Sequence, residues 1–202
     1  MHRIVLLFVA VSLLPQDLSK VIAGIAAEAQ GKVAVACFLP GAKMMCGLNE
    51  ESQPPMQSVF NLPLAMAVLY AVEQGQFRVD QPIRFTKEDR FFPKTHSPLQ
   101  DKYPEADVDV PLEELMRLSV SASDNVAADV LLRVLGGPEK VQAYIDSLGT
   151  SGVSKGLAPA TNGVGFISLT DGRQLAVAVF VTDSRAPLDV GEAVIAKVAK
   201  VI

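Results

Sequence analysis

Apolar residues recur with two different periods along the chain, and each period predicts one kind of element. The helical period, with apolar residues three and four positions apart, runs through residues 17–29, 111–120, 126–135, 138–148 and 189–201. Shorter runs rich in β-branched residues predict strands at residues 32–39, 44–48, 162–169 and 174–182. Residues 75–109 are polar and punctuated by proline. Residues 54–73 differ from all of these, because a Gln-Ser pair leads directly into a long apolar helix.

Ser58 lies at the first turn of that helix, where a hydroxyl can serve two different purposes. The unpaired N–H groups and the positive end of the helix dipole would stabilise a nucleophile and the oxyanion it produces. Serine is also a preferred N-cap residue, so Ser58 could simply cap the helix. The pattern of apolar residues leaves both interpretations open.

The runs 32–39 and 44–48 predict a hairpin whose turn is formed by residues 40–43. Leu39 then faces Met44, and counting outward places Cys37 directly opposite Cys46. These are the only two cysteines. We expect two buried free thiols, because directly opposed strand positions often have poor disulfide geometry, with a disulfide as the alternative. Neither cysteine is expected to be catalytic.

The first residues of the chain resemble a secretory signal. Met1, His2 and Arg3 form a charged start, and residues 4–14 form an apolar run that is too short to span a bilayer. We therefore predict a signal peptide at residues 1–15 and one domain at residues 16–202, in the periplasm or secreted. The alternative is an N-terminal helix that stays in the fold.

Composition excludes several classes of partner. Half of the residues are hydrophobic and the formal net charge is −4, so neither nucleic acid nor a membrane surface is an expected partner. No repeat or low-complexity segment is present in the sequence. His96 is the only histidine after the signal, and no carboxylate or serine motif adjoins it, so we expect a surface or packing residue. We expect a monomer with no metal and no cofactor.

Residues 58–61 read Ser-Val-Phe-Asn and are followed by an apolar helix. This stretch resembles the nucleophile helix of the class A serine β-lactamases, whose motif is Ser-x-x-Lys. The resemblance implies that Ser58 is the nucleophile and that Asn61 stands at the catalytic lysine position. An asparagine side chain can hydrogen-bond but cannot accept a proton at neutral pH.

A second motif follows at a helix junction, where Ser123, Asp124 and Asn125 occur in sequence. The resemblance implies that Ser123 relays a proton to the leaving nitrogen and that Asn125 binds the side-chain amide of the substrate. Asp124 is also well suited to cap the helix that follows.

The third family motif, Lys-Thr-Gly, is incomplete here. Gly149 is followed by Thr150 and Ser151, which by resemblance bind substrate, but Ser147 and Leu148 stand where the lysine and threonine would be. The family's segment before this point carries a loop with a water-activating Glu and several helices. That segment is missing, and the two ends join at an apparent internal deletion near residues 148–150.

The fold implied is α+β: an antiparallel sheet of about four strands, with N- and C-terminal helices packed on it, plus a reduced helical lobe. Losing a strand should leave an unpaired sheet edge. The function implied is hydrolysis of β-lactams through an acyl-enzyme on Ser58, with little or no activity in this form. The alternatives are a catalytically dead, truncated member of the family and a module that only binds.

Overall fold

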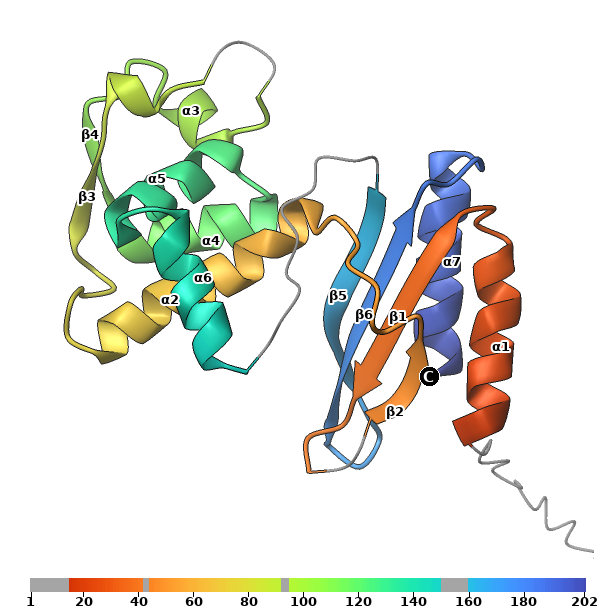
Figure 1. The fold of residues 1–202 in the computed structure, drawn as a ribbon. Coiled ribbons are helices and arrows are strands. Elements are labelled where there is room, and N and C mark those ends of the chain that lie inside the picture. The colour runs from red at the N-terminus through yellow and green to blue at the C-terminus, as the bar shows by residue number, and fades with distance from the viewer. Residues whose placement is uncertain (1–14, 42–43, 92–94, 150–159) are drawn as a thin grey trace, which may run out of the picture. The chain divides into compact units, whose positions relative to one another are not determined.

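A computed structural model describes residues 15–41, 44–91, 95–149 and 160–202 (Figure 1). The chain forms two compact units, which we name the sheet unit (Met1–Pro55 with Gly156–Ile202) and the helical unit (Met56–Lys155). The sheet unit is therefore built from both ends of the chain, whereas the helical unit is one continuous stretch. Among the described residues, no helix combines the length and the apolar character that a membrane span requires.

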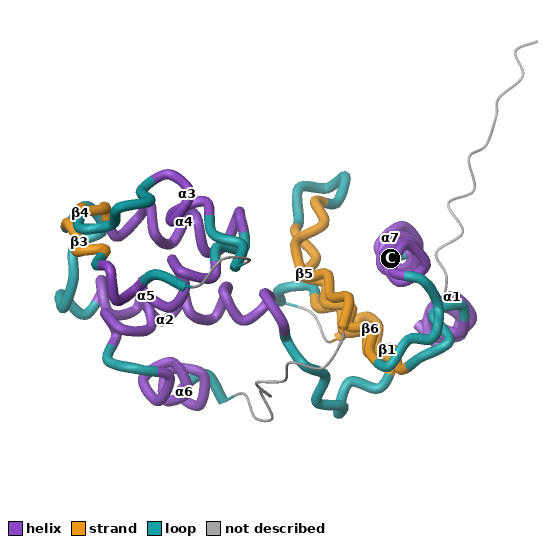
Figure 2. Tube along the Cα trace, turned by 90° about the horizontal axis from the view of Figure 1, so that it is seen from above, coloured by secondary structure: helices purple, strands orange, loops and turns teal. Residues whose placement is uncertain are grey.

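The sheet unit contains one antiparallel sheet with helices on one of its faces. Its strands are β1 (Lys32–Phe38), β2 (Met44–Leu48), β5 (Ala160–Ser168) and β6 (Gln174–Thr182). They are ordered β2-β1-β6-β5, so that β5 forms one edge. The helices α1 (Pro15–Ala27) and α7 (Leu188–Val201) lie side by side against the sheet (Figure 2). The expected α+β class, with terminal helices on a four-stranded sheet, is confirmed.

Alternation along the strands explains which face the helices cover. Val33 and Val35 of β1 point to the same side as Val179 and Val181 of β6, and all four are buried with Ile22 of α1 and Val194 of α7. At Gly163 of β5 the backbone comes so close to α7 that an added Cβ would lie 2.7 Å from Cγ2 of Ile195. Glycine at this position therefore allows α7 to pack directly on the edge strand.

The two cysteines form a disulfide, so the expectation of free thiols is wrong. Cys37 and Cys46 are directly opposed, as expected, and their Cα atoms are 5.2 Å apart, within the usual range for a disulfide. The pairing next to them differs from the expected one, because Phe38 and not Leu39 pairs with Met44 across an irregularity between Cys37 and Phe38. The extra residue fits a β-bulge beside the turn.

The helical unit surrounds α2 (Asn61–Glu73), whose Leu64 and Val68 are fully buried. Its other elements are η1 (Gln57–Phe60), β3 (Pro82–Phe85), η2 (Lys87–Asp89), α3 (Pro98–Lys102), β4 (Val108–Pro111), α4 (Leu112–Ala122), α5 (Asn125–Leu135) and α6 (Pro138–Ser147). The ladder of β3 and β4 is not indicated by the apolar periodicity. Its strands are short, and Pro82 pairs with Pro111 at one end.

Candidate active site

Ser58 lies in η1, the short 3₁₀ turn that leads into α2. No side chain caps η1 or α2, whose N-cap residues are Met56 and Phe60, so the interpretation of Ser58 as a helix cap is wrong. The Ser58 side chain is exposed and makes no hydrogen bond to another described residue. The hydroxyl is therefore free to meet a molecule from solvent.

The residue before Ser58 has an unusual backbone conformation. Gln57 has a φ of 49°, in the left-handed region that side chains other than glycine rarely adopt. Such a conformation costs on the order of 1 to 3 kcal/mol and persists only where the surrounding structure fixes it. The sequence gives no signal of this, because glutamine has no preference for left-handed backbone.

Asn61 is the first residue of α2, and only 4% of it is exposed. Its Nδ2 group donates a hydrogen bond of 3.0 Å to the backbone carbonyl of Ser119 in α4. The hydroxyl of Ser119 is buried and has no hydrogen-bond partner among the described residues. The Asn61 side chain therefore connects α2 to α4. It occupies the position at which the family motif has its catalytic lysine.

The Ser-Asp-Asn motif forms the connection between α4 and α5. Ser123, half-buried, ends α4 in the left-handed conformation, with φ 50° and ψ 38°. Asp124 is fully buried, and its Oδ1 accepts hydrogen bonds from the Ala127 N–H at 2.9 Å and the Ser97 hydroxyl at 2.8 Å. Its Oδ2 accepts one from the Leu99 N–H at 2.6 Å. Asp124 therefore caps α5 and fixes the start of α3.

His96 forms hydrogen bonds to the same connection between α4 and α5. Its side chain is exposed, and its Nε2 donates to the carbonyl oxygen of Ala122 at 2.7 Å. Its own carbonyl oxygen accepts two hydrogen bonds from Asn125, one from the backbone N–H and one from Nδ2, each 3.2 Å long. His96 is thus a surface residue. By bonding Ala122 and Asn125, it holds the backbone on both sides of Ser123 and Asp124. The sequence does not show this role, because His96 and Ala122 are 26 positions apart.

Arg133, in the last turn of α5, belongs to a structural network. Arg133 donates to both carboxylate oxygens of Asp89, at 2.7 and 2.8 Å, and to the carbonyl oxygen of Arg84. Burial raises the pKa of the Asp129 carboxyl, and the Asp89 carboxylate raises it further.

The structure brings four of the six predicted site residues into one unit. Ser58, Asn61, Ser123 and Asn125 all belong to the helical unit, at the start of α2 and between α4 and α5. Thr150 and Ser151 lie outside the described residues. Among the described residues, no group of three or more His, Cys, Asp or Glu side chains is placed to hold a metal.

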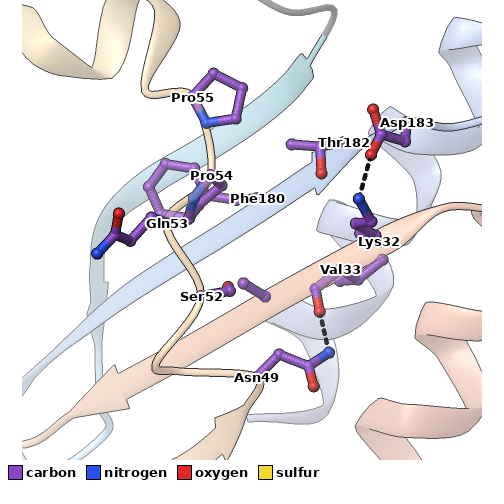
Figure 3. A pocket seen from close by; sticks show the side chains of 11 residues that line it. Lys32, Val33, Asn49, Ser52, Gln53, Pro54, Pro55, Phe180, Thr182 and Asp183 are labelled. Carbon is purple, nitrogen blue, oxygen red and sulfur yellow. Dashed lines mark hydrogen bonds and ion pairs between the residues drawn. The ribbon is translucent and has the colours of Figure 1, made fainter. Parts of the chain in front are cut away.

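A pocket of about 570 Å³ lies in the sheet unit, under the segment 52–55 that crosses β1 and β6 (Figure 3). Lys32 and Asp183 form an ion pair of 2.7 Å at its rim, and Asn49 donates to the carbonyl oxygen of Val33 at 2.8 Å. Among the described residues that line it, none is a predicted site residue.

Comparison with known proteins identifies the family. The model of the β-lactamase enzyme family matches residues 16–156, more than half of the chain. The chain belongs to the β-lactamase enzyme family. The match includes Ser58 with its helix and the complete Ser123-Asp124-Asn125 motif.

Individual β-lactamases are similar over most of the chain. Beta-lactamase VEB-1 of Pseudomonas aeruginosa is 24% identical over 84% of this chain and 84% of its own length. The extended-spectrum β-lactamase PER-1 of the same organism is 29% identical over 76% of this chain and 75% of its own length. A β-lactamase crystal structure from Chitinophaga pinensis matches with a TM-score of 0.83 and 29% identity, over 91% of this chain and 97% of its own. The α+β fold is thus that of the family.

This β-lactamase-family chain is short. The alignment with VEB-1 extends over 252 residues, whereas the chain has 202. Residues of the relative therefore have no counterpart here, which is consistent with the expected truncation.

Proposed function

We propose that this β-lactamase-family protein is acylated slowly by β-lactams at Ser58 and does not turn them over. The observation that carries this proposal is the exposed Ser58 hydroxyl, which lacks a hydrogen bond to any described residue, next to a strained Gln57. VEB-1 and PER-1 are both named β-lactamases, which supports β-lactams as the reacting class.

The proposed reaction is one covalent step. The Ser58 oxygen attacks the carbonyl carbon of the four-membered ring, the ring C–N bond breaks, and Ser58 is left as an ester. The hydroxyl proton ends on the released nitrogen, and Ser123 is placed in a connection that Asp124 and His96 hold in shape. No proton-accepting side chain stands at position 61, and losing a general base typically slows a reaction by about 10² to 10⁴.

A specific observation favours a second candidate, a module that binds β-lactams without reacting. The Asn61 amide is already bonded to the Ser119 carbonyl, so it has little freedom to assist Ser58. In this case the ligand would leave when the protein is denatured, whereas an ester on Ser58 would remain.

Intact-mass spectrometry under denaturing conditions separates the two candidates. Incubation of the folded protein with benzylpenicillin should add the mass of one penicillin over hours, and Ser58→Ala should abolish the adduct. Ser121→Ala is the matched control, because Ser121 is an exposed serine of the same unit. Its hydroxyl donates a hydrogen bond to the carbonyl oxygen of Arg117. An adduct that persists in Ser58→Ala, or no adduct in any variant, would reject acylation at Ser58.

We also propose export to the periplasm or the medium. Residues 1–14 of the predicted signal lie outside the described residues. Fractionation of cells that express the full chain tests this proposal: shortening of the chain near residue 15 in the exported fraction supports it, and a full-length cytoplasmic protein opposes it.

A further inference from the structure

The outer edge of β5 has features that proteins usually avoid at a sheet edge. Among the described residues, β5 pairs with β6 and with no second strand. Its nine residues, Ala-Thr-Asn-Gly-Val-Gly-Phe-Ile-Ser, include no charge and no proline. Natural edge strands are normally protected by charges, prolines, bulges or covering segments, because their unpaired N–H and C=O groups attract another strand.

The exposed side chains of β5 are concentrated in its middle. Val164 is 38% and Phe166 is 67% exposed, and alternation puts both on the face opposite α7. Between them, Gly165 has no atom within 4 Å of the position where a Cβ would be. Within the described part of the chain, the stretch 164–166 is therefore largely exposed on both faces and has no strand paired along its outer edge.

We propose that β5 pairs antiparallel with β5 of a second copy, joining two four-stranded sheets into one. The strand fits its own copy because an antiparallel pair centred on Gly165 puts Val164 of each copy opposite Phe166 of the other. Two apolar cross-strand pairs then form on one face. The strand has no charge that its copy could repel, and pairing satisfies backbone groups that no other described strand bonds.

The contact is small, which predicts a weak dimer in equilibrium with the monomer that the sequence leads us to expect. One strand pair with four apolar side chains buries less than the roughly 1,200 Å² that stable complexes usually need. We expect a dissociation constant of roughly 10 µM, since interfaces of this size give transient association. The two-fold arrangement pairs the β5 edge of one copy with the β5 edge of the other, so this contact closes at two copies.

Sedimentation velocity from about 1 to 200 µM of the whole chain tests the proposal. The wild-type protein should convert from monomer to dimer over this range, and Val164→Lys should weaken the dimer at least about tenfold by placing a charge at each apolar pair. Val21→Lys is the matched control. Val21 is also a valine of the sheet unit with 38% exposure, but it lies on α1, at the far side of the sheet from β5 (Figure 2).

Hydrogen exchange measured by mass spectrometry is the second readout, and it needs no variant. Amides of residues 163–168 should exchange more slowly at the higher concentration, whereas those of α1 should not change. A monomer at every concentration, polymers larger than a dimer, or equal weakening by both lysine variants would overturn the proposal. So would a dimer without concentration-dependent protection in β5.

Discussion

Asn61 stands where the family motif has its lysine, and its surroundings determine what a replacement could do. The side chain is buried, beside the Ser119 carbonyl that it bonds and a Ser119 hydroxyl that has no partner among the described residues. An ammonium group placed there would lose hydration, which lowers the pKa of a lysine and favours the neutral amine. A lysine at position 61 would therefore be more often neutral and able to accept a proton, and it would lower the stability of the fold.

We expect Asn61→Lys to speed acylation of Ser58 without restoring turnover. The new amine could take the Ser58 proton one helical turn away. Hydrolysis of the ester needs a second base, and the acids in α6 are unsuited to it, since Glu139 lies in its first turn and Asp146 accepts a hydrogen bond from Gln142. Burst and steady-state rates with a chromogenic cephalosporin measure the two steps.

Asn61→Gln is the matched control for that experiment, because it keeps an amide and adds no base. It should leave the labelling rate as slow as in the wild-type protein. Many turnovers per molecule of Asn61→Lys within minutes would show that the missing segment is dispensable.

Helix α5 depends on one buried carboxylate for its start. Asp124 accepts three hydrogen bonds, from Ala127 of its own helix and from Ser97 and Leu99 at the start of α3. An N-cap satisfies backbone N–H groups that the helix cannot pair internally. Here the same group also joins two elements, so its loss affects more than one helix end.

We expect Asp124→Asn to destabilise the helical unit by about 1 to 3 kcal/mol, because the amide turns an NH₂ toward a backbone N–H that is left unpaired. Urea unfolding followed by far-UV circular dichroism measures the change. Asp101→Asn, at an exposed acid of α3, should change stability by less than about 0.5 kcal/mol. Equal stabilities of the two variants would show that the Asp124 contacts contribute little.

Sequence patterns predict most elements, because the helical and strand periods are clear wherever one face is buried. The helix predicted at 126–135 is α5, which begins one residue earlier and ends before Gly136, whose φ of 92° suits glycine. Helix α4 begins at Leu112 because Pro111 closes the β3–β4 ladder. No local pattern encodes the β3–β4 ladder, the hydrogen bonds of His96 or the conformation of Gln57. These features depend on contacts between residues that are distant in the sequence.

At the scale of the whole molecule, the two units have separate hydrophobic cores. One gathers around Leu64, Leu115 and Leu131 in the helical unit, and the other lies between the sheet and its two helices. The disulfide joins β1 to β2 within the sheet unit and encloses a loop with a sequence separation of 9. Any effect of breaking it should therefore be confined to the sheet unit.

We expect reduction of the Cys37–Cys46 bond to lower the stability of the sheet unit by about 2 to 3 kcal/mol, the loop-closure effect for a loop of this length. Native-state hydrogen exchange with and without a phosphine reductant measures it unit by unit. Amides of β1 and β6 should lose protection, and those of α2 and α5 should keep theirs. Equal loss in both units would mean that they unfold together.

The pairing of β1 with β6 also has a consequence for the order in which the protein is made. Lys32 pairs with Thr182, so β1 leaves the ribosome long before its central partner exists. At about 5 to 20 residues per second, that wait lasts on the order of ten seconds. The helical unit is one continuous stretch that ends at Lys155. We therefore expect the helical unit to fold without waiting for β6, and the β1–β2 hairpin to stay unfinished and bound by chaperones until β6 is available.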